Sequence, residues 1–385
     1  MAKRSVVISD DKGSTDNKPS LFNDMLIDAL KSDVGGSSFI LGRDDSPSDV
    51  KEWISTGNTV LDMCISNNPN SDGGIPVGRL TELHGDSSTG KSLLGYTILK
   101  NCAEKGGVSV LLDTENSANE EFMKMLGLKP EENLVYSVPD TVEDVFKSIE
   151  TIIRTTRKSD KGRLVTIVWD SVAATSTKKE MEEDVGQANV ALVARTIGQG
   201  MRKIKRLLGH ERIALIFLNQ LRSKIGVVFG DPYTTPGGNA IPFFADVRIR
   251  LYTAGKITVA KDVIGITTKA KVIKTRFGPP FREAMLKVYF DRGLVQEESW
   301  EEYLKTKKFI TSVSGTRNFK LKLDGSDEAH EYKGKEFVEF IRSNPELKSK
   351  IEQMIRTDLY VEQDPSKREE EESIEEFTDD EVANI

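Results

Sequence analysis

Apolar positions in the middle of the chain form a series of short runs that predict the strands of a sheet. Runs of strand length, rich in β-branched residues, occupy 80–83, 108–112, 164–169, 213–218, 247–251 and 284–290. Helical stretches separate the four consecutive runs that begin with 108–112 and end with 247–251. A further amphipathic helical pattern begins at Leu93. This alternation predicts an α/β fold over residues 50–291, with a mostly parallel central sheet covered by helices on both faces.

The chain ahead of this core contains one short amphipathic pattern. Residues 1–20 are polar and are expected to form a disordered leader. In 21–49, ahead of the breaker Gly35-Gly36, apolar residues recur at helical spacing: Phe22, Met25, Leu26 and Leu30. The apolar face of this short helix must be buried, either on its own domain or as an oligomerisation contact on a neighbouring subunit. The pattern leaves both options open.

The chain after the core is predicted to form a small C-terminal α/β domain and an acidic tail. The domain covers 292–360 and ends in two helical patterns, at 334–342 and 345–359. The segment 361–385 carries eleven carboxylates against two basic residues, a net charge of −9, and is expected to be disordered. Because the whole chain has a formal charge of −7, the remainder carries +2. A mildly basic body is compatible with nucleic-acid binding, and the tail either restrains duplex binding or only solubilises the protein.

Composition restricts the class of protein further. At 385 residues, of which 37% are hydrophobic, the chain is long enough for two or three domains with a large core. No apolar run approaches the roughly 20 residues needed to cross a bilayer, and the N-terminus lacks the apolar core of a signal peptide. We therefore expect a cytoplasmic protein with no membrane partner. The two cysteines and three scattered histidines argue against a disulfide framework or a zinc site.

The segment after the first strand has the pattern of a phosphate-binding loop (P-loop). It consists of Gly85, Asp86, Ser87, Ser88, Thr89, Gly90, Lys91 and Ser92, between a predicted strand and a predicted helix. Glycines let the backbone N–H groups point inward, and the N-terminus of the following helix favours an anion at the same place. Lys91 would contact the β- and γ-phosphates, and the hydroxyl of Ser92 would hold Mg²⁺. An accidental match in a surface loop is the alternative, and the flanking elements argue against it.

Two carboxylates follow neighbouring predicted strands. Asp170 ends the run 164–169, where a P-loop sheet usually places a second holder of Mg²⁺, although Asp at this position is also a common helix cap. Glu115 follows the run 108–112 and would lie at the carboxyl edge of the sheet, near the phosphates. There it would either act as a base that orients water for hydrolysis or merely solvate the edge.

A long glycine-rich loop follows the strand 213–218, beginning after Asn219-Gln220. A loop of this length in a compact domain is usually functional or disordered, and here it begins beside the expected γ-phosphate. Its polar residues and glycines suit contact with a sugar-phosphate chain, and its two apolar residues could stack on bases. The candidate DNA-binding residues in it are Arg222, Lys224, Ile225, Gly226, Phe229, Thr235, Gly237, Gly238 and Asn239. A second polar loop, at 180–191, leads into a helix whose Arg195 and Arg202 share one face, which is either a DNA contact or a solvated surface.

With these motifs in place, the chain resembles the RecA family of homologous-recombination proteins over roughly residues 20–360. The resemblance is carried by Ile54-Ser55-Thr56-Gly57, Gly74-Ile75-Pro76-Val77-Gly78-Arg79, Val168-Trp169-Asp170-Ser171-Val172-Ala173-Ala174, Met201-Arg202-Lys203, and the segments 218–230 and 234–240. It implies a RecA-type ATPase core with ATP and Mg²⁺ as ligands. It also implies that Glu115 is the base, that Gln220 senses the γ-phosphate, and that the loops near 183–192 and 221–239 hold DNA. Lys274 and Arg276 would reach the γ-phosphate of the neighbouring subunit.

Several positions depart from the pattern of the family. The family usually has lysine at both trans-acting positions. Arg276 could neutralise the charge on the γ-phosphate in the same way, as an arginine finger does. Asn119 stands where bacterial members have an aspartate facing the adenine amino group, which loosens the expected base preference, and Phe122 replaces a tyrosine that stacks on adenine. Pro236 interrupts a threonine run, and the insertion at 67–72 is atypical. Such drift around an intact core is typical of a divergent, bacteriophage-type member.

The sequence therefore predicts an ATP-dependent recombinase that forms filaments on single-stranded DNA and exchanges strands with homologous duplex in recombination and DNA repair. A single-strand binding protein and loading mediators are further candidate partners. Two alternatives remain: a ring-forming helicase or DNA motor on the same fold, and a nucleotide-gated DNA-binding regulator without catalysis. The joint presence of Lys91, Ser92, Glu115, Asp170 and Gln220 weakens the second.

Overall fold

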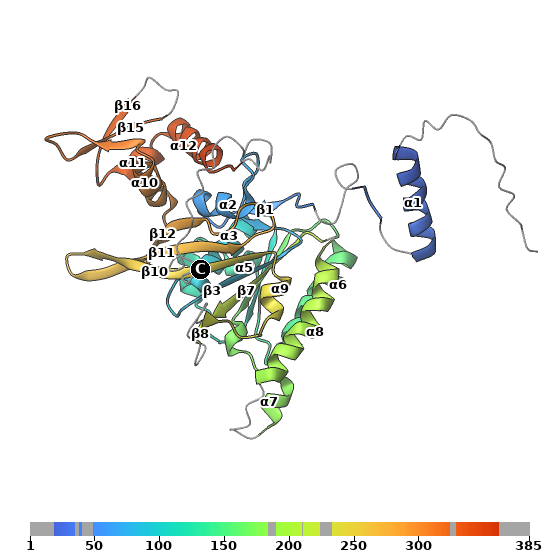
Figure 1. Cartoon of the computed structure of the whole chain (residues 1–385). Helices are drawn as coiled ribbons and strands as arrows, with labels where there is room; N and C mark the ends of the chain where they lie inside the picture. The colour runs from blue at the N-terminus through green and yellow to red at the C-terminus, as the bar shows by residue number, and fades with distance from the viewer. Residues whose placement is uncertain are drawn as a thin grey trace, which may run out of the picture. The chain divides into compact units, whose positions relative to one another are not determined.

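The computed structural model describes residues 19–34, 38–40, 49–183, 190–209, 211–223, 233–323 and 329–361 (Figure 1). The chain divides into two units, 1–49 and 50–385, which are described separately. Among its described residues the first unit contains one helix, α1 (Pro19–Val34), which includes all four residues of the amphipathic pattern expected within 21–49. On it, Phe22, Met25, Leu26 and Leu30 are exposed. No helix in the described ranges is long and apolar enough to span a membrane.

The second unit is built on a nine-stranded sheet of order β13-β12-β11-β10-β3-β7-β6-β4-β5. Five neighbouring pairs, from β10-β3 to β4-β5, are parallel, and the three pairs from β13 to β10 are antiparallel. The strands are β3 (Leu80–Gly85), β4 (Val108–Asp113), β5 (Leu134–Ser137), β6 (Val165–Asp170), β7 (Ile213–Gln220), β10 (Val247–Val259), β11 (Asp262–Lys274), β12 (Glu283–Tyr289) and β13 (Gly293–Leu294). The predicted mostly parallel α/β core is confirmed.

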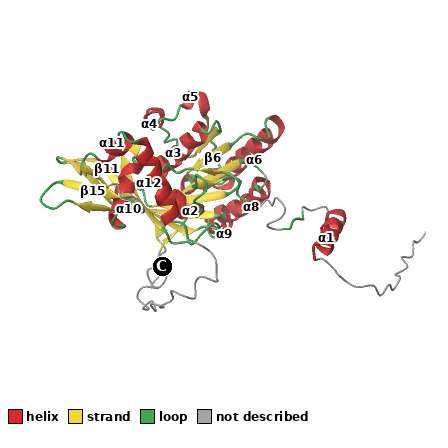
Figure 2. Cartoon of the chain, turned by 90° about the horizontal axis from the view of Figure 1, so that it is seen from above, coloured by secondary structure: helices red, strands yellow, loops and turns green. Residues whose placement is uncertain are grey.

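Alternating side chains of the strands supply two cores, one on each face of the sheet. Figure 2 shows the helices and strands of the chain from above. On one face, α6 (Val142–Ser159) and α8 (Val190–Leu208) cover a cluster in which Trp169 and Phe217 pack edge to face at 4.8 Å. On the other face, α2 (Thr59–Ser66) and α3 (Lys91–Glu104) share a cluster with the C-terminal helices. Because both faces are covered, the carboxyl edge of the parallel strands is where a ligand can reach the backbone.

Short elements complete the unit. They are β1 (Trp53–Ile54), β2 (Ile75–Pro76), α4 (Glu120–Met125), α5 (Pro130–Asn133), η1 (Val172–Ala174), α7 (Lys178–Glu182), β8 (Arg222–Ser223), β9 (Tyr233–Thr234) and α9 (Ala240–Phe244). Local sequence fixes several helix starts. Thr141 accepts a hydrogen bond from the N–H of Asp144 at the start of α6, and Thr177 with Glu180 forms a capping box on α7.

The C-terminal region contains a three-stranded antiparallel sheet and three helices. The sheet has the order β14 (Ile310–Ser312), β15 (Asn318–Lys322), β16 (Ala329–Lys333), and the helices are α10 (Gln296–Thr306), α11 (Phe337–Arg342) and α12 (Pro345–Asp358). The predicted helix at 334–342 begins only at Phe337, because the chain leaves β16 at Lys333 and turns first. The predicted helix at 345–359 is confirmed to within one residue.

Candidate nucleotide and DNA site

The P-loop lies between the end of β3 and the start of α3, as predicted. Gly90 has φ +90°, a conformation that side chains other than glycine rarely adopt. A Cβ on Gly85 would lie 2.4 Å from the carbonyl oxygen of Leu251, so β10 packs directly against the start of the loop. The hydroxyl of Thr268 on β11 donates to the carbonyl of Thr89 at 3.1 Å. The loop is thus held in shape by backbone conformation and by two neighbouring strands.

Lys91 is folded back onto the loop. Its ammonium donates to the carbonyl oxygens of Gly85 at 3.0 Å and of Asp86 at 2.6 Å. Burial lowers the pKa of Lys91, while the carboxylates of Asp170, Asp86 and Glu115 act in the opposite direction. These contacts aim the charge of the side chain at the concave side of the loop, where phosphates bind.

Asp170 is the last residue of β6 and is only 4% exposed. Burial raises the pKa of Asp170 to about 6, against a hydrogen bond from Ser92 that lowers it; Glu115 and Asp113 raise it further. Within the described part of the chain, Oδ2 of Asp170 is buried and has no hydrogen-bond partner. A buried carboxylate oxygen left free beside a serine hydroxyl fits a hard cation such as Mg²⁺.

Glu115 lies in the loop after β4 and is held by two residues that the sequence analysis did not identify. Asp113 accepts hydrogen bonds from the N–H groups of Glu115 at 3.0 Å and Ala118 at 2.9 Å, which fixes the turn. The hydroxyl of Ser171 donates to Oε1 of Glu115. The amide of Gln220, at the end of β7, reaches the same oxygen at 3.5 Å. The structure therefore brings the predicted base and the predicted phosphate sensor together.

Asn119 and Phe122 lie at the start of α4. The side-chain oxygen of Asn119 accepts from the N–H of Phe122 at 2.9 Å, so the residue caps this helix. The ring of Phe122 packs edge to face on Tyr96, with 6.3 Å between ring centroids. The position predicted to recognise the base therefore has a structural role of its own.

The two limbs of the glycine-rich loop come together at its base. Arg222 and Ser223 in β8 pair with Tyr233 and Thr234 in β9. Thr235 is buried, and a Cβ on Gly237 would meet Ile197 of α8 at 3.0 Å. Gly238 likewise approaches α8, and Asn239 precedes α9. Arg195 and Arg202 are exposed on α8. The predicted residues Lys224, Ile225, Gly226 and Phe229 lie outside the described residues.

Lys274 and Arg276 lie at the end of β11 and contact their own subunit. The ammonium of Lys274 donates to the carbonyl oxygens of Pro242 at 2.7 Å and Phe243 at 3.1 Å, both in α9. Arg276 pairs with Asp246 at 3.2 Å. Burial, with the charge of Arg276, lowers the pKa of Lys274. The sequence singled out both cations, but it gave no indication of these contacts.

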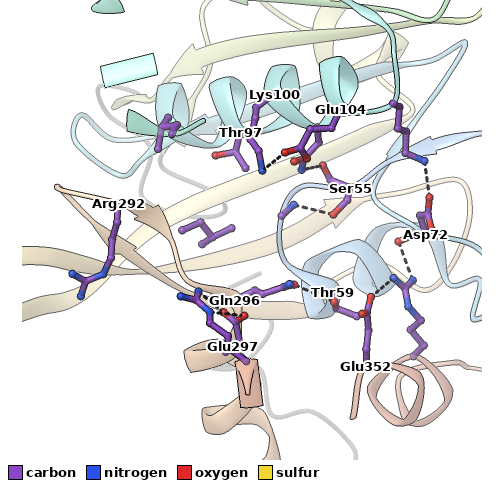
Figure 3. Close-up of a pocket in the computed structure, with 17 residues that line it drawn as sticks. Ser55, Thr59, Asp72, Thr97, Lys100, Glu104, Arg292, Gln296, Glu297 and Glu352 are labelled. Carbon is purple, nitrogen blue, oxygen red and sulfur yellow. Dashed lines mark hydrogen bonds and ion pairs between the residues drawn. The ribbon is translucent and has the colours of Figure 1, made fainter. Parts of the chain in front are cut away.

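A pocket of about 490 Å³ lies elsewhere, between α2, α3 and the C-terminal helices (Figure 3). Its walls carry charges of both signs, most of them paired: Lys105 with Asp72, Arg342 with Glu297, and others around them. None of the predicted site residues lines this pocket. It is therefore distinct from the P-loop site.

Comparison with known proteins points to one family. The profile of the RecA N-terminal domain matches residues 24–295. Protein RecA of Thermus aquaticus is 39% identical over 260 residues, which cover 67% of this chain and 73% of that protein. Protein RecA of Legionella pneumophila is 31% identical over 334 residues, which cover 86% of this chain and 90% of that protein. The range matched by the profile spans the P-loop, both carboxylates and both limbs of the glycine-rich loop.

Proposed function

Because the chain belongs to the RecA family and is accordingly a DNA-dependent ATPase of recombination and repair, we propose how its own residues carry out this activity. The protein polymerises on single-stranded DNA in the cytoplasm, pairs it with homologous duplex and exchanges strands. One observation carries the proposal. Gln220 reaches the predicted base Glu115 with its side chain and is the residue from which the glycine-rich loop departs. ATP and DNA are therefore sensed at adjacent positions of one strand.

The nucleotide binds in the P-loop, with the residues 85–92 around its phosphates. Mg²⁺, held by Ser92 and Asp170, supplies charge neutralisation on the β- and γ-phosphates. The orphaned oxygen of Asp170 supports this assignment. Glu115 orients the attacking water; Ser171 holds its carboxylate, and Asp113 holds its backbone N–H. Phe122 contacts the adenine, and Asn119 faces its amino group while it caps α4.

DNA binds along the glycine-rich loop and the exposed side of α8. Arg195, Arg202 and Arg222 are exposed and would neutralise phosphates, whereas Gly237, Gly238 and Asn239 offer backbone N–H groups close to α8. Lys224, Ile225, Gly226 and Phe229 belong to the same proposal from their chemistry alone. A surface that contacts phosphates binds DNA of any base sequence, as a recombinase requires.

The site is completed by a second copy of the chain in a helical filament. Lys274 and Arg276 of one subunit would approach the γ-phosphate bound to the next, where they stabilise the charge that develops on hydrolysis. The apolar residues of α1, Phe22, Met25, Leu26 and Leu30, would be covered by a neighbouring copy in the filament. A single-strand binding protein and loading mediators would act on this filament.

A strand-exchange assay tests the proposal. The protein is incubated with ATP, Mg²⁺, a circular single strand and a homologous linear duplex, and joint molecules are followed on a gel. We expect joint molecules only with homologous DNA and ATP. DNA-stimulated ATPase without joint molecules would reject strand exchange. Negative-stain microscopy of the same mixture separates a recombinase from a ring helicase, because the first forms helical filaments and the second closed rings.

The role of Glu115 has its own test. Glu115→Gln keeps the size of the side chain but removes the basic carboxylate, so we expect ATP turnover to fall on the order of 10²–10⁴-fold. Binding of a fluorescent ATP analogue should change little. The exposed Glu121→Gln is the matched control and should retain turnover. Unaltered turnover in Glu115→Gln would remove Glu115 from the role of base.

A further inference from the structure

The side chain of Asn219 connects three parts of the molecule. Its Nδ2 donates to Oε1 of Glu82 on β3 at 3.0 Å and to the carbonyl oxygen of Pro236 at 3.1 Å. Its Oδ1 accepts from the N–H of Gln220 at 3.0 Å. Because the two Nδ2 partners are acceptors and the Oδ1 partner is a donor, only one orientation of the amide satisfies all three. Asn219 is fully buried, so none of these bonds competes with water.

Asn219 lies at the neck of the glycine-rich loop. The outgoing limb begins at Gln220 and Leu221, and the N–H of Leu221 donates to the carbonyl of Gly85 in the P-loop at 3.3 Å. The returning limb passes Pro236 just before Gly237, which packs on Ile197 of α8. One amide therefore holds the start of the loop, beside the nucleotide, and the end of the loop, beside the DNA-binding helix.

A buried charge pair gives this amide a rigid support. Glu82 is 0% exposed, and its Oε2 accepts from Nε of Arg248 on β10 at 2.6 Å. The strands β10, β3 and β7 are adjacent; Arg248 lies opposite Glu82, and the side chain of Asn219, which lies opposite His84, reaches Glu82 diagonally, so hydrogen bonds join the three residues in a row. Removing one member of such a row leaves a buried polar group unpaired. The pair of Glu82 and Arg248 is the fixed part against which the amide of Asn219, Gln220 and the loop can move.

We propose that Asn219 is the positioning residue that couples the nucleotide site to the DNA loop. A shift of Gln220 toward a γ-phosphate moves its N–H, and the bonded amide of Asn219 carries the carbonyl of Pro236 with it. The placement of Gly237 and Gly238 against α8 then depends on the nucleotide. By reciprocity, DNA that orders the loop draws Gln220 toward the phosphate. The inference rests on the proposed function, because the coupled ligands are ATP and single-stranded DNA.

The paired exchange Glu82→Gln with Asn219→Asp isolates this role from stability. The new glutamine donates to the new aspartate and accepts from Arg248, and the aspartate still accepts from the N–H of Gln220. The row keeps one carboxylate and one guanidinium. Only the donor to Pro236 is lost, because an ionised carboxylate has no N–H. Glu121→Gln combined with Asn70→Asp makes the same two exchanges at exposed positions outside the row and is the matched control.

The measured quantity is a ratio: the affinity for a fluorescent single-stranded oligonucleotide with a slowly hydrolysed ATP analogue, divided by the affinity without nucleotide. For the wild type and for the control pair we expect a ratio between about 5 and 150, the usual range of coupling. For the double variant we expect a ratio at least fivefold lower, with affinity for the ATP analogue unchanged within twofold. A purely structural role of Asn219 would not move the ratio in a folded variant.

Each outcome decides a separate question. A folded double variant with the wild-type ratio would overturn the coupling role of Asn219 and leave the proposed function intact. If the affinity of the wild-type protein for DNA does not change with the nucleotide, both the coupling role of Asn219 and the proposed function are rejected. If the double variant does not fold, amide exchange in the wild type replaces it. The ATP analogue without DNA should change exchange in residues 235–241, and unchanged exchange there would overturn the inference.

Discussion

At the scale of single residues, the buried carboxyl of Asp170 makes stability depend on pH. Burial raises its pKa from 3.8 to about 6. Between pH 3.8 and about 6, Asp170 therefore keeps a proton in the native state that it has already released in the unfolded state. Stability therefore falls as the pH rises through this window, and the full cost, about 3 kcal/mol, is present above pH 6. A carboxylate that is costly without ligand is well suited to bind a cation when ATP arrives.

The substitution Asp170→Asn tests this account. In the absence of nucleotide and with a chelator present, we expect the variant to be about 3 kcal/mol more stable than the wild type at pH 7.5 and about half as much at pH 5. Urea unfolding across this range measures the difference. The exposed Asp140→Asn should show no such trend. A difference between Asp170→Asn and the wild type that is constant with pH would contradict the assignment.

The candidate site was predictable where a residue follows a strand. Lys91, Ser92 and Asp170 stand at strand ends or in a recognised loop, so their position along the chain gave their place in space. Asp113 was missed because it acts through a local turn, in which it accepts from the N–H of Glu115, and Ser171 was missed because it reaches Glu115 from a different segment. A serine between an aspartate and a small 3₁₀ helix carries no sequence signal for such a contact.

At the scale of elements, the atypical insertion after α2 holds the end of the folded chain. Asn67 exchanges two hydrogen bonds with Val361: its Nδ2 donates to the carbonyl at 2.9 Å, and its Oδ1 accepts from the N–H at 3.0 Å. Arg282 donates to the same Oδ1 at 2.9 Å. Arg356 of α12 donates to the carbonyls of Ser71 and Asp72 in the same insertion. Val361, assigned to the tail by its sequence, therefore belongs to the folded body.

Asn67→Gly should release this attachment without straining the backbone. Asn67 has φ +48°, and glycine tolerates this conformation, so the substitution removes the side-chain bonds alone. We expect local stability to fall by about 2 kcal/mol, and amide exchange of Tyr360 and Val361 to accelerate accordingly. Mass spectrometry of the C-terminal peptide measures the rates. Asn70→Gly in the same insertion is the control, and equal rates in the two variants would show that Asn67 does not hold the chain end.

The long hairpin of β10 and β11 shows why some elements were not predicted. Only 247–251 of β10 was identified, because that part is buried beside β3 and reads as an apolar run. The remainder of β10 is largely exposed, β11 alternates buried with half-buried residues, and the turn at Ala260 and Lys261 contains none of the glycine or asparagine that marks a tight hairpin. Ala260 instead adopts φ +60°. The two strands of the hairpin are stabilised by pairing with each other, and a local sequence pattern does not reveal such pairing.

At the scale of the whole molecule, the sequence left open whether α1 packs on its own domain or on another subunit. Contact of its apolar residues with a neighbouring copy is the option that we propose. Leu26→Glu places a charge on this face, so we expect filament formation to be lost while the thermal unfolding of the core is unchanged. Electron microscopy with single-stranded DNA and an ATP analogue is the measurement. Lys31→Glu, near the end of the same helix, changes charge outside the apolar set and should retain filaments.

The distribution of charge leads to the last prediction. The segment 362–385 carries −9, and the remaining residues carry +2, so the chain combines a weakly basic body with a strongly acidic appendage. Because the attachment of Val361 places the start of this segment on the folded body, its carboxylates compete with DNA phosphates for the same cations. Removing 362–385 should tighten duplex binding severalfold at 50 mM salt, and the effect should shrink toward 300 mM as charges are screened. Fluorescence anisotropy with a short duplex measures both affinities. A tail of the same length with its eleven carboxylates changed to amides should reproduce the deletion; unchanged affinity in both would show that the segment only solubilises the protein.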